Sequence, residues 1–310
     1  MSVIILCPGQ GSQKVGMGKD LAERFPAARE VFQAVDDALG VPLSRLMWEG
    51  PEDELTLTHN AQPAILAHSA AVFAVVRERL GTPVVGLGHS LGEYSAYVTA
   101  GALEATSAAR LVRRRGELML EAGKKRPGAM AAILALDPAQ VVEACAEAST
   151  DGLVAVAANL NEPGQTVISG DPAAVERAGE GCKARGAKRV IPLKVSGAFH
   201  SPLMAPAVAG LREALAATAF RAPVFPVIAN ATAHPVSTAA DAVRLLAEQL
   251  TAPVRWTESV RAAAERGAGA RWVEIGPGAV LSGLLKKIVP GAAATTLGTA
   301  DEVGKFMETA

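Results

Sequence analysis

Residues 83–92 read Pro-Val-Val-Gly-Leu-Gly-His-Ser-Leu-Gly, and this stretch decides the expected fold. The apolar run 83–87 has the length of a buried strand, and residues 88–92 match the pattern Gly-x-Ser-x-Gly. In that pattern the glycines permit a sharp turn from a strand into a helix, which exposes the serine hydroxyl at the end of a sheet. Helix-like sequence follows as far as Ala100. Ser90 is therefore predicted to be a nucleophile, and the amide of Leu91 a donor to a developing oxyanion.

Strand-like and helix-like segments alternate on both sides of this turn. Upstream lie a strand at 3–7 and helical patterns at 25–39 and 64–80. Downstream lie helical patterns at 203–217, 241–250, 254–266 and 281–288, with a strand at 272–275. This alternation predicts an α/β fold that resembles a hydrolase, in which helices cover both faces of a mostly parallel sheet.

The order of strand-like and helix-like segments is different between residues 126 and 195. Strand patterns at 130–136, 153–157, 165–169 and 188–193 alternate with helical patterns at 139–148 and 173–184. This β-α-β-β-α-β order is that of the ferredoxin-like unit. We expect residues 126–195 to form a small domain inserted in a large domain made of residues 1–125 and 196–310.

The composition excludes several classes of protein. Among 310 residues, 50% are hydrophobic and the net charge is −1, which indicates a globular chain without the basic excess of a general nucleic-acid binder. No apolar run is long enough for a membrane span, and the first residues lack the basic region of a signal peptide, so a cytoplasmic protein is expected. The three cysteines are widely spaced and form no CxxC, which predicts neither a disulfide framework nor a metal site.

The glycine-rich segment 9–18 follows the first strand, but it does not fit a nucleotide loop. Lys14 stands where the dinucleotide fingerprint needs glycine, and Met17 stands where a P-loop needs lysine. Two interpretations remain open. The segment is a plain tight turn, or Gly9 and Gly11 bring the backbone amide of Gln10 close to a ligand as an oxyanion donor.

Histidine is the usual base for a serine nucleophile, and the chain has five. His89 lies on the turn itself and should point away from the Ser90 hydroxyl. His59 and His68 flank or lie within a predicted helix, and His234 precedes Pro235 in a predicted loop. His200 follows the last strand of the small domain, in a loop that returns to the large sheet, and it is the predicted base. No acid between Ser90 and His200 stands out as its partner. The helix end at 248–250 offers free carbonyls instead, so a dyad is predicted rather than a triad.

Arg115 lies in the middle of the apolar stripe of the helix predicted at 106–121, whereas Arg113 points to the opposite face. A guanidinium on an apolar face is costly unless an anion pairs with it, and its planar fork suits a carboxylate. Two interpretations are open: a structural ion pair with a core acid, or a contact with a substrate carboxylate close to Ser90.

Taken together, these residues resemble the malonyl-CoA:acyl carrier protein transacylase family over nearly the whole chain. The motifs that carry the resemblance are PGQGSQ at 8–13, QPA at 62–64, GHSLGEYS at 88–95, RG at 115–116, NEPGQ at 161–165, GAFHS at 197–201 and EQL at 248–250. The resemblance implies a hydrolase-like domain with a ferredoxin-like insertion, in agreement with the element order above.

The resemblance also implies a role for each matching residue. Ser90 would be the acylated nucleophile, His200 its base, and Gln249 the residue whose main-chain carbonyl orients that base. The oxyanion hole and the substrate-binding set would follow from the same motifs: the amides of Gln10 and Leu91, the carboxylate-binding Arg115, and Gln62, Asn161 and Phe199 near the site. Residues 198–200, Ala-Phe-His, resemble the malonyl-selective members, since methylmalonyl-selective ones tend to carry serine before the histidine.

The implied activity is ping-pong transfer of a malonyl group from malonyl-CoA to the phosphopantetheine thiol of holo acyl carrier protein, in fatty acid biosynthesis. We expect a monomer with no metal, no bound cofactor, and no nucleic-acid or membrane partner. Basic clusters at 124–126, 183–189 and 286–287 would attract an acidic carrier. The alternatives are a malonyltransferase that serves a polyketide synthase in trans, a serine esterase or thioesterase, and a non-catalytic α/β scaffold.

Overall fold

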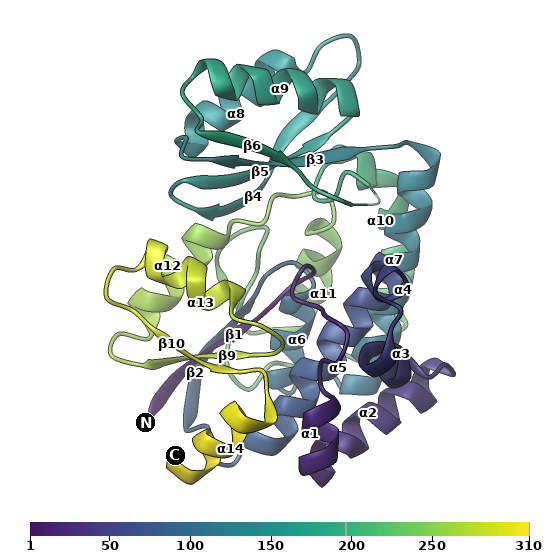
Figure 1. Cartoon of the computed structure of the whole chain (residues 1–310), viewed down its shortest axis with the longest axis vertical. Coiled ribbons are helices and arrows are strands. Elements are labelled where there is room, and N and C mark those ends of the chain that lie inside the picture. The colour runs from purple at the N-terminus through teal and green to yellow at the C-terminus, as the bar shows by residue number, and fades with distance from the viewer. Residues whose placement is uncertain (196, 310) are drawn as a thin grey trace.

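A computed structural model describes residues 1–195 and 197–309, which include a large and a small sheet (Figure 1). The large sheet has the strand order β10-β9-β1-β2-β7-β8. Its strands are β1 (Ser2–Cys7), β2 (Thr82–Gly88), β7 (Val227–Ile228), β8 (Pro235–Val236), β9 (Arg271–Ile275) and β10 (Ala294–Leu297). The pairings from β10 to β7 are parallel, whereas β8 runs antiparallel to β7. The predicted α/β class with a mostly parallel sheet is confirmed.

Apolar side chains of β1 alternate between the two faces of this sheet, as a strand buried on both faces requires. Val3 and Ile5 belong to the core beneath α5 (Thr58–Val76), while Ile4 and Leu6 pack with Trp256 in a second core. The second core lies under α12 (Trp256–Arg266) and α13 (Val280–Ile288) (Figure 1). The main helices of the first side are α2 (Pro26–Leu39), α6 (Gly92–Thr99), α7 (Ala105–Lys125), α10 (Ala205–Ala216) and α11 (Ala239–Glu248).

The small sheet has the order β4-β5-β3-β6 and is antiparallel. Its strands and the two helices on one face are β3 (Ala129–Leu134), α8 (Pro138–Ala148), β4 (Ala155–Glu162), β5 (Gln165–Gly170), α9 (Pro172–Ala184) and β6 (Arg189–Pro192). The predicted β-α-β-β-α-β order is therefore confirmed, and the unit has an apolar core of its own between sheet and helices. The opposite face of this sheet is turned toward the large sheet (Figure 1).

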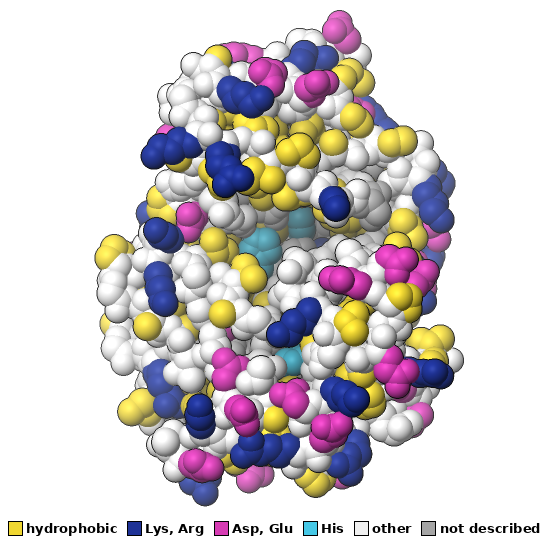
Figure 2. Space-filling model, in the orientation of Figure 1, with side chains coloured by type: hydrophobic (Ala, Val, Ile, Leu, Met, Phe, Trp, Pro, Cys, Tyr) yellow, Lys and Arg dark blue, Asp and Glu magenta, His cyan; other side chains and the backbone are white. Residues whose placement is uncertain are grey.

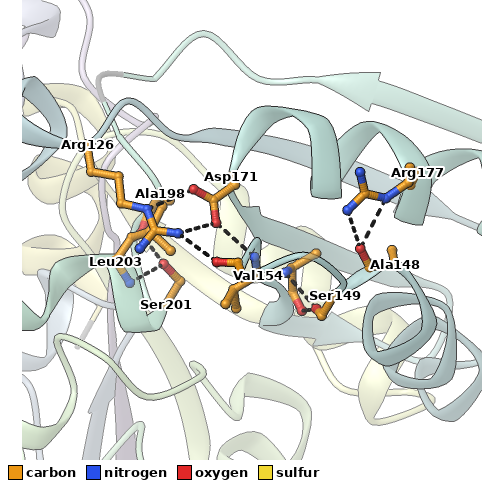
Figure 3. A network of polar contacts seen from close by, with 11 residues as sticks. Arg126, Ala148, Ser149, Val154, Asp171, Arg177, Ala198, Ser201 and Leu203 are labelled. Carbon is orange, nitrogen blue, oxygen red and sulfur yellow. Dashed lines mark hydrogen bonds and ion pairs between the residues drawn. The ribbon is translucent and has the colours of Figure 1, made fainter.

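The segment that leads into the small sheet, at Gly128, lies next to the segment that leads out of it, at Ala198. A Cβ built on Gly128 would lie only 2.5 Å from the Cβ of Ala198, so the two segments are in close contact there. Just before this point, Arg126 forms a bidentate ion pair with Asp171, with nitrogen–oxygen distances of 2.8 and 2.7 Å (Figure 3). Asp171 also accepts a hydrogen bond from the Val154 amide at 2.8 Å. These contacts link the entering segment to β4 and α9.

Two expected boundaries are wrong. The helix expected at 64–80 is α5, which begins at Thr58 and ends at Val76. Pro63 lies inside it and cannot donate to the carbonyl of His59, and Arg113 Nη1 donates to that carbonyl instead at 3.3 Å. The strand expected at 153–157 is β4, which runs over 155–162 and keeps its pairing with β5 through irregularities in register.

Several elements were not predicted from sequence: α1 (Lys19–Arg24), α3 (Leu43–Glu49), α4 (Glu52–Thr56), β7, β8, β10 and α14 (Ala300–Thr309). The helix expected at 203–217 begins as the 3-10 turn Pro202–Met204 and continues as α10. Ser196, at which the second part of the large domain is expected to begin, lies outside the described residues. Within the described ranges, no helix combines the length and the apolar character needed to cross a bilayer.

Candidate active site

Ser90 occupies the turn between β2 and α6 with a φ of +52°, a left-handed conformation that is strained for a residue with a side chain. The flanking glycines make this turn possible. A Cβ on Gly88 would lie 1.9 Å from the Gly92 carbonyl oxygen, and a Cβ on Gly92 would lie 2.1 Å from the Cys7 carbonyl oxygen. Ser90 is thereby placed beyond the carboxyl end of a central strand, as the Gly-x-Ser-x-Gly pattern predicts.

His200 contacts Ser90 directly. Its Nε2 lies 2.7 Å from Ser90 Oγ, and its Nδ1 lies 2.9 Å from the main-chain carbonyl oxygen of Gln249. Because a carbonyl only accepts, Nδ1 must carry the ring proton of the neutral imidazole, and Nε2 is free to take the serine proton. The loop beyond His200 is held by the Ser201 hydroxyl, which donates to the Ala198 carbonyl at 2.7 Å.

The surroundings of His200 keep its imidazole neutral. Burial lowers its pKa first, the positive charge of Arg115 lowers it further, and the pKa falls to about 3. The ring is thus an unprotonated base throughout the physiological range of pH. A nearby cation also favours the alkoxide that forms when Ser90 loses its proton.

Arg115 is 1% exposed and reaches Ser90 from α7. Its Nη2 donates to Ser90 Oγ at 3.2 Å and to Gln249 Oε1 at 3.0 Å, and its Nη1 donates to Gln62 Oε1 at 2.7 Å. Its guanidinium carbon lies 5.5 Å from the ring centroid of Tyr94. Within residues 1–195 and 197–309, no carboxylate lies within 4.0 Å of this guanidinium, so the structural ion pair considered from the sequence is not formed there. In the described part of the chain this buried cation has no carboxylate in direct contact, and Gln249 lies between it and Glu93.

The amides of Gln10 and Leu91 belong to residues that line one cleft with Ser90. Neither amide donates a hydrogen bond to another described part of the chain. The loop that carries Gln10 sits directly on the serine turn, since a Cβ on Gly9 would lie 2.3 Å from the carbonyl oxygen of His89. Two free backbone donors are therefore available where a carbonyl oxygen of an acyl group would gain negative charge.

The cleft lies between the two sheets and has a volume of about 560 Å³. Figure 2 shows it as a hollow across the middle of the molecule, with histidine side chains in its depth. Phe199 and Asn161 line it, and Asn161 Oδ1 lies 2.8 Å from Nε2 of His89. The ring of His89 thus contacts Asn161 of β4 rather than the Ser90 hydroxyl. A cleft of this size, lined by apolar side chains together with polar groups that include Ser90, His200 and Arg115, suits an acyl thioester with an extended arm.

The predicted site residues therefore meet in one place, and comparison with known proteins assigns the chain to a family. Residues 4–310 match the acyl transferase domain family. Over 286 residues the chain is 49% identical to the malonyl CoA-acyl carrier protein transacylase of Bacillus subtilis, and the match covers 92% of this chain and 90% of that protein. The chain belongs to the malonyl-CoA:acyl carrier protein transacylase family. The transacylase of Escherichia coli strain K12 is 45% identical over 303 residues, which is 97% of each chain.

Solved structures of transacylase family members have the same fold over their full length. The acyl carrier protein S-malonyltransferase of Vibrio cholerae superposes with a TM-score of 0.93 at 42% identity, covering 98% of this chain and 99% of that chain. A malonyl-transacylase solved in complex with its type II PKS acyl-carrier protein superposes with a TM-score of 0.94 at 43% identity, covering 100% of this chain and 99% of that one. The resemblance found from the sequence motifs is confirmed.

Two residues that hold the Ser90 turn of this transacylase family member in place were not predicted from the sequence. Asn230 Oδ1 accepts from the Ser90 amide at 2.7 Å, and its Nδ2 donates to the Gly88 carbonyl at 2.7 Å. Glu93 is fully buried and accepts from the Asn230 amide at 3.0 Å and from Gln249 Nε2 at 2.7 Å. Burial raises the pKa of Glu93 to about 7. Asn230 follows a two-residue strand that gives no periodic signal, whereas Glu93 carried a signal, since it is the one charged residue of the helix that follows the turn.

Proposed function

We propose that this protein transfers a malonyl group from malonyl-CoA to the phosphopantetheine thiol of holo acyl carrier protein, as the names of its relatives describe for them. The observation that carries the proposal is the buried Arg115 guanidinium, 3.2 Å from the nucleophile and without a carboxylate partner in the described chain. A substrate with a free carboxylate next to its thioester supplies that partner. The guanidinium fork then fixes the acyl group by two charge-assisted hydrogen bonds.

The first half-reaction forms a covalent acyl-enzyme. His200 Nε2 takes the proton of Ser90 Oγ as the oxygen attacks the thioester carbonyl, and the carbonyl oxygen becomes negative. In the proposal the amides of Gln10 and Leu91 donate to that oxygen. The carbon–sulfur bond then breaks, CoA leaves with the proton from His200, and malonate remains as an ester on Ser90. The carbonyl of Gln249 keeps the imidazole in its reactive tautomer throughout.

The second half-reaction reverses the acylation of Ser90, with the thiol of the carrier protein in place of the thiol of CoA. The phosphopantetheine thiol of the carrier gives its proton to His200 and attacks the serine ester, and the ester bond to Ser90 breaks as the oxygen regains a proton. The relative solved with its acyl-carrier protein supports a carrier as partner. Basic clusters at 124–126, 183–189 and 286–287 suit an acidic carrier, although Arg126 and Arg185 are engaged by Asp171 and Glu147.

A serine esterase or thioesterase would use the same turn with water as the second nucleophile. Such an enzyme has no use for an unpaired guanidinium beside the serine, which favours the transferase. A pathway in fatty acid biosynthesis is favoured by the names of the relatives, and service to a polyketide synthase in trans is the second candidate, favoured by the similarity to the type II PKS transacylase.

Further parts of the proposal concern the working form of the enzyme. We propose a cytoplasmic monomer that uses no resident cofactor, since serine, histidine and backbone amides suffice for thioester exchange. The apolar core between the small sheet and its two helices supports a small domain of residues 126–195 inserted in a large domain of residues 1–125 and 196–310, and Met130, Ala158 and Val167 of the small sheet join the main core of the large domain.

The test follows label from radiolabelled malonyl-CoA, with and without holo acyl carrier protein. Label that accumulates on the enzyme alone, and moves to the carrier when the carrier is added, is the expected result. Release of most of the label as free malonate in the presence of the carrier would contradict transfer and support the hydrolase. Apo carrier protein, which lacks the phosphopantetheine thiol, is the matched control and should remain unlabelled.

A further inference from the structure

Thr58 connects two parts of the site that carry different functions. It is the first residue of α5 and its side chain is buried. Its hydroxyl donates to Gln10 Oε1 at 2.8 Å and accepts from Gln62 Nε2 at 3.0 Å. Gln62 in turn accepts from Arg115 Nη1 through its Oε1, at 2.7 Å. A single chain of hydrogen bonds therefore runs from the guanidinium to the loop that carries the Gln10 amide.

The direction of each hydrogen bond in the series Arg115–Gln62–Thr58–Gln10 follows from the guanidinium at one end. A guanidinium only donates, so the amide oxygen of Gln62 must face Arg115 and its NH₂ group must face Thr58. The Thr58 hydroxyl must then accept from Gln62, and its own proton points to the Gln10 oxygen. Hydrogen bonds arranged head to tail in a buried site polarise one another in the same sense. The side chain of Gln10 thus has one preferred orientation.

The other side-chain hydrogen bonds of the Gln10 loop lie within the loop. The Ser12 hydroxyl donates to the Gly9 carbonyl at 2.8 Å, and the Gly11 amide donates to Gln13 Oε1 at 2.7 Å. The loop also packs on the serine turn at Gly9, but that contact does not orient the Gln10 side chain. The Gln10 residue itself is exposed to the cleft, so the Thr58 hydroxyl is its buried anchor on a helix.

We propose that Thr58 is a positioning residue: its hydroxyl holds Gln10 so that the Gln10 amide meets the acyl oxygen, and it ties that amide to the guanidinium that binds the malonyl carboxylate. The inference rests on the proposed function, since it takes the Gln10 amide as an oxyanion donor. Its consequence differs from that of Arg115. Every thioester substrate needs the oxyanion donor, with or without a carboxylate.

The decisive variant is Thr58→Val, which keeps the shape of the side chain and removes both hydrogen bonds. Thr58→Ser restores the hydroxyl. Thr99→Val is the matched control, because Thr99 is also buried and its hydroxyl bonds only within α6, to the Ala96 carbonyl at 2.8 Å. For each protein, kcat and KM are measured with malonyl-CoA and with acetyl-CoA, normalised to the burst of Ser90 acylation, together with the melting temperature.

Loss of an oxyanion donor lowers kcat by about 100- to 1,000-fold, and a displaced donor retains part of its effect. We therefore expect Thr58→Val to lower kcat by about 10- to 100-fold for both thioesters with little change in KM. Thr58→Ser should lie within about threefold of wild type, and Thr99→Val should change the melting temperature alone.

Three results would overturn the inference. A normal kcat in Thr58→Val, with only a lower melting temperature, would make Thr58 purely structural. A loss of kcat with malonyl-CoA but not with acetyl-CoA would show that Thr58→Val acts through Arg115 and not through the oxyanion donor. An equal loss in Thr58→Ser would show that the hydroxyl is not the cause. Failure of the proposed function is seen separately, as hydrolysis by the wild-type enzyme in the presence of holo carrier.

Discussion

Replacing Arg115 by alanine tests the assignment of this guanidinium to the substrate carboxylate. The side chain is 1% exposed, so a carboxylate bound to it is little screened by water, and loss of one partner of such a hydrogen-bonded pair costs about 2 to 5 kcal/mol. At 1.36 kcal/mol per factor of ten, kcat/KM for malonyl-CoA should fall by about 30-fold to several-thousand-fold.

The same substitution also removes contacts that no substrate makes. Gln62 Oε1 and Gln249 Oε1 each lose the donor that Arg115 supplies, at 2.7 and 3.0 Å, and this cost falls on every substrate alike. Acetyl-CoA has no carboxylate, so the ratio of kcat/KM for malonyl-CoA to that for acetyl-CoA isolates the carboxylate contact. We expect this ratio to fall by at least about 30-fold.

Arg114→Ala is the control for the loss of an arginine from α7. Arg114 is exposed and pairs with Glu117 and Glu121 of the same helix at 3.6 and 3.7 Å, and its removal should leave the malonyl-to-acetyl ratio unchanged. Thermal unfolding of both variants accompanies the kinetics. An equal fractional loss for the two thioesters in Arg115→Ala would refute the carboxylate-binding role, and with it the main reason to prefer a malonyltransferase to a general serine acyl hydrolase.

Two further predictions concern pH. Because the charge of Arg115 lowers the pKa of His200, Arg115→Ala should move the acid limb of kcat/KM for acetyl-CoA to higher pH, whereas coincident profiles of the variant and wild type would contradict this coupling. Burial lowers the pKa of His68 from 6.5 to about 4, so between these pH values the unfolded state binds a proton that the folded state does not, and stability falls as the pH falls from 6.5 toward 4. Urea unfolding at pH 7 and pH 4.5 should therefore show a wild-type stability that declines more on acidification than that of His68→Asn, by up to about 3 kcal/mol, and equal declines would be evidence against a neutral buried His68.

Much of the fold follows from local patterns in the sequence. The strand before Ser90 and the periodic helix that carries Arg115 are long, regular signals, and the structure has both where they were expected. The same holds for the element order of the small sheet. Elements such as β7, two residues long, form because neighbouring strands supply their hydrogen bonds, and a two-residue segment has no period to detect.

In the site, too, the residues with a local sequence pattern were predicted, and the residues defined by long-range contacts were not. Ser90 and His200 were found from a turn pattern and a position in the chain, and the helix end at 248–250 indicated a carbonyl as partner of the histidine. The contacts of Asn230, Glu93 and the Gln249 side chain were not accessible, because they join residues more than a hundred positions apart or depend on which end of an amide faces a charge. Such networks are defined by tertiary packing and not by local sequence.

The most direct test of the account is the identity and fate of the acylated residue. Wild-type enzyme and Ser90→Ala are incubated with malonyl-CoA, with or without a subsequent chase with holo acyl carrier protein. The samples are then quenched and digested, and the peptide masses are determined by mass spectrometry. We predict a malonyl group on Ser90 of the wild-type enzyme, its loss to the carrier during the chase, and an unmodified but folded Ser90→Ala protein. Malonyl on one of the buried cysteines Cys7, Cys145 or Cys182, or a Ser90→Ala variant that still loads the carrier, would contradict the serine mechanism.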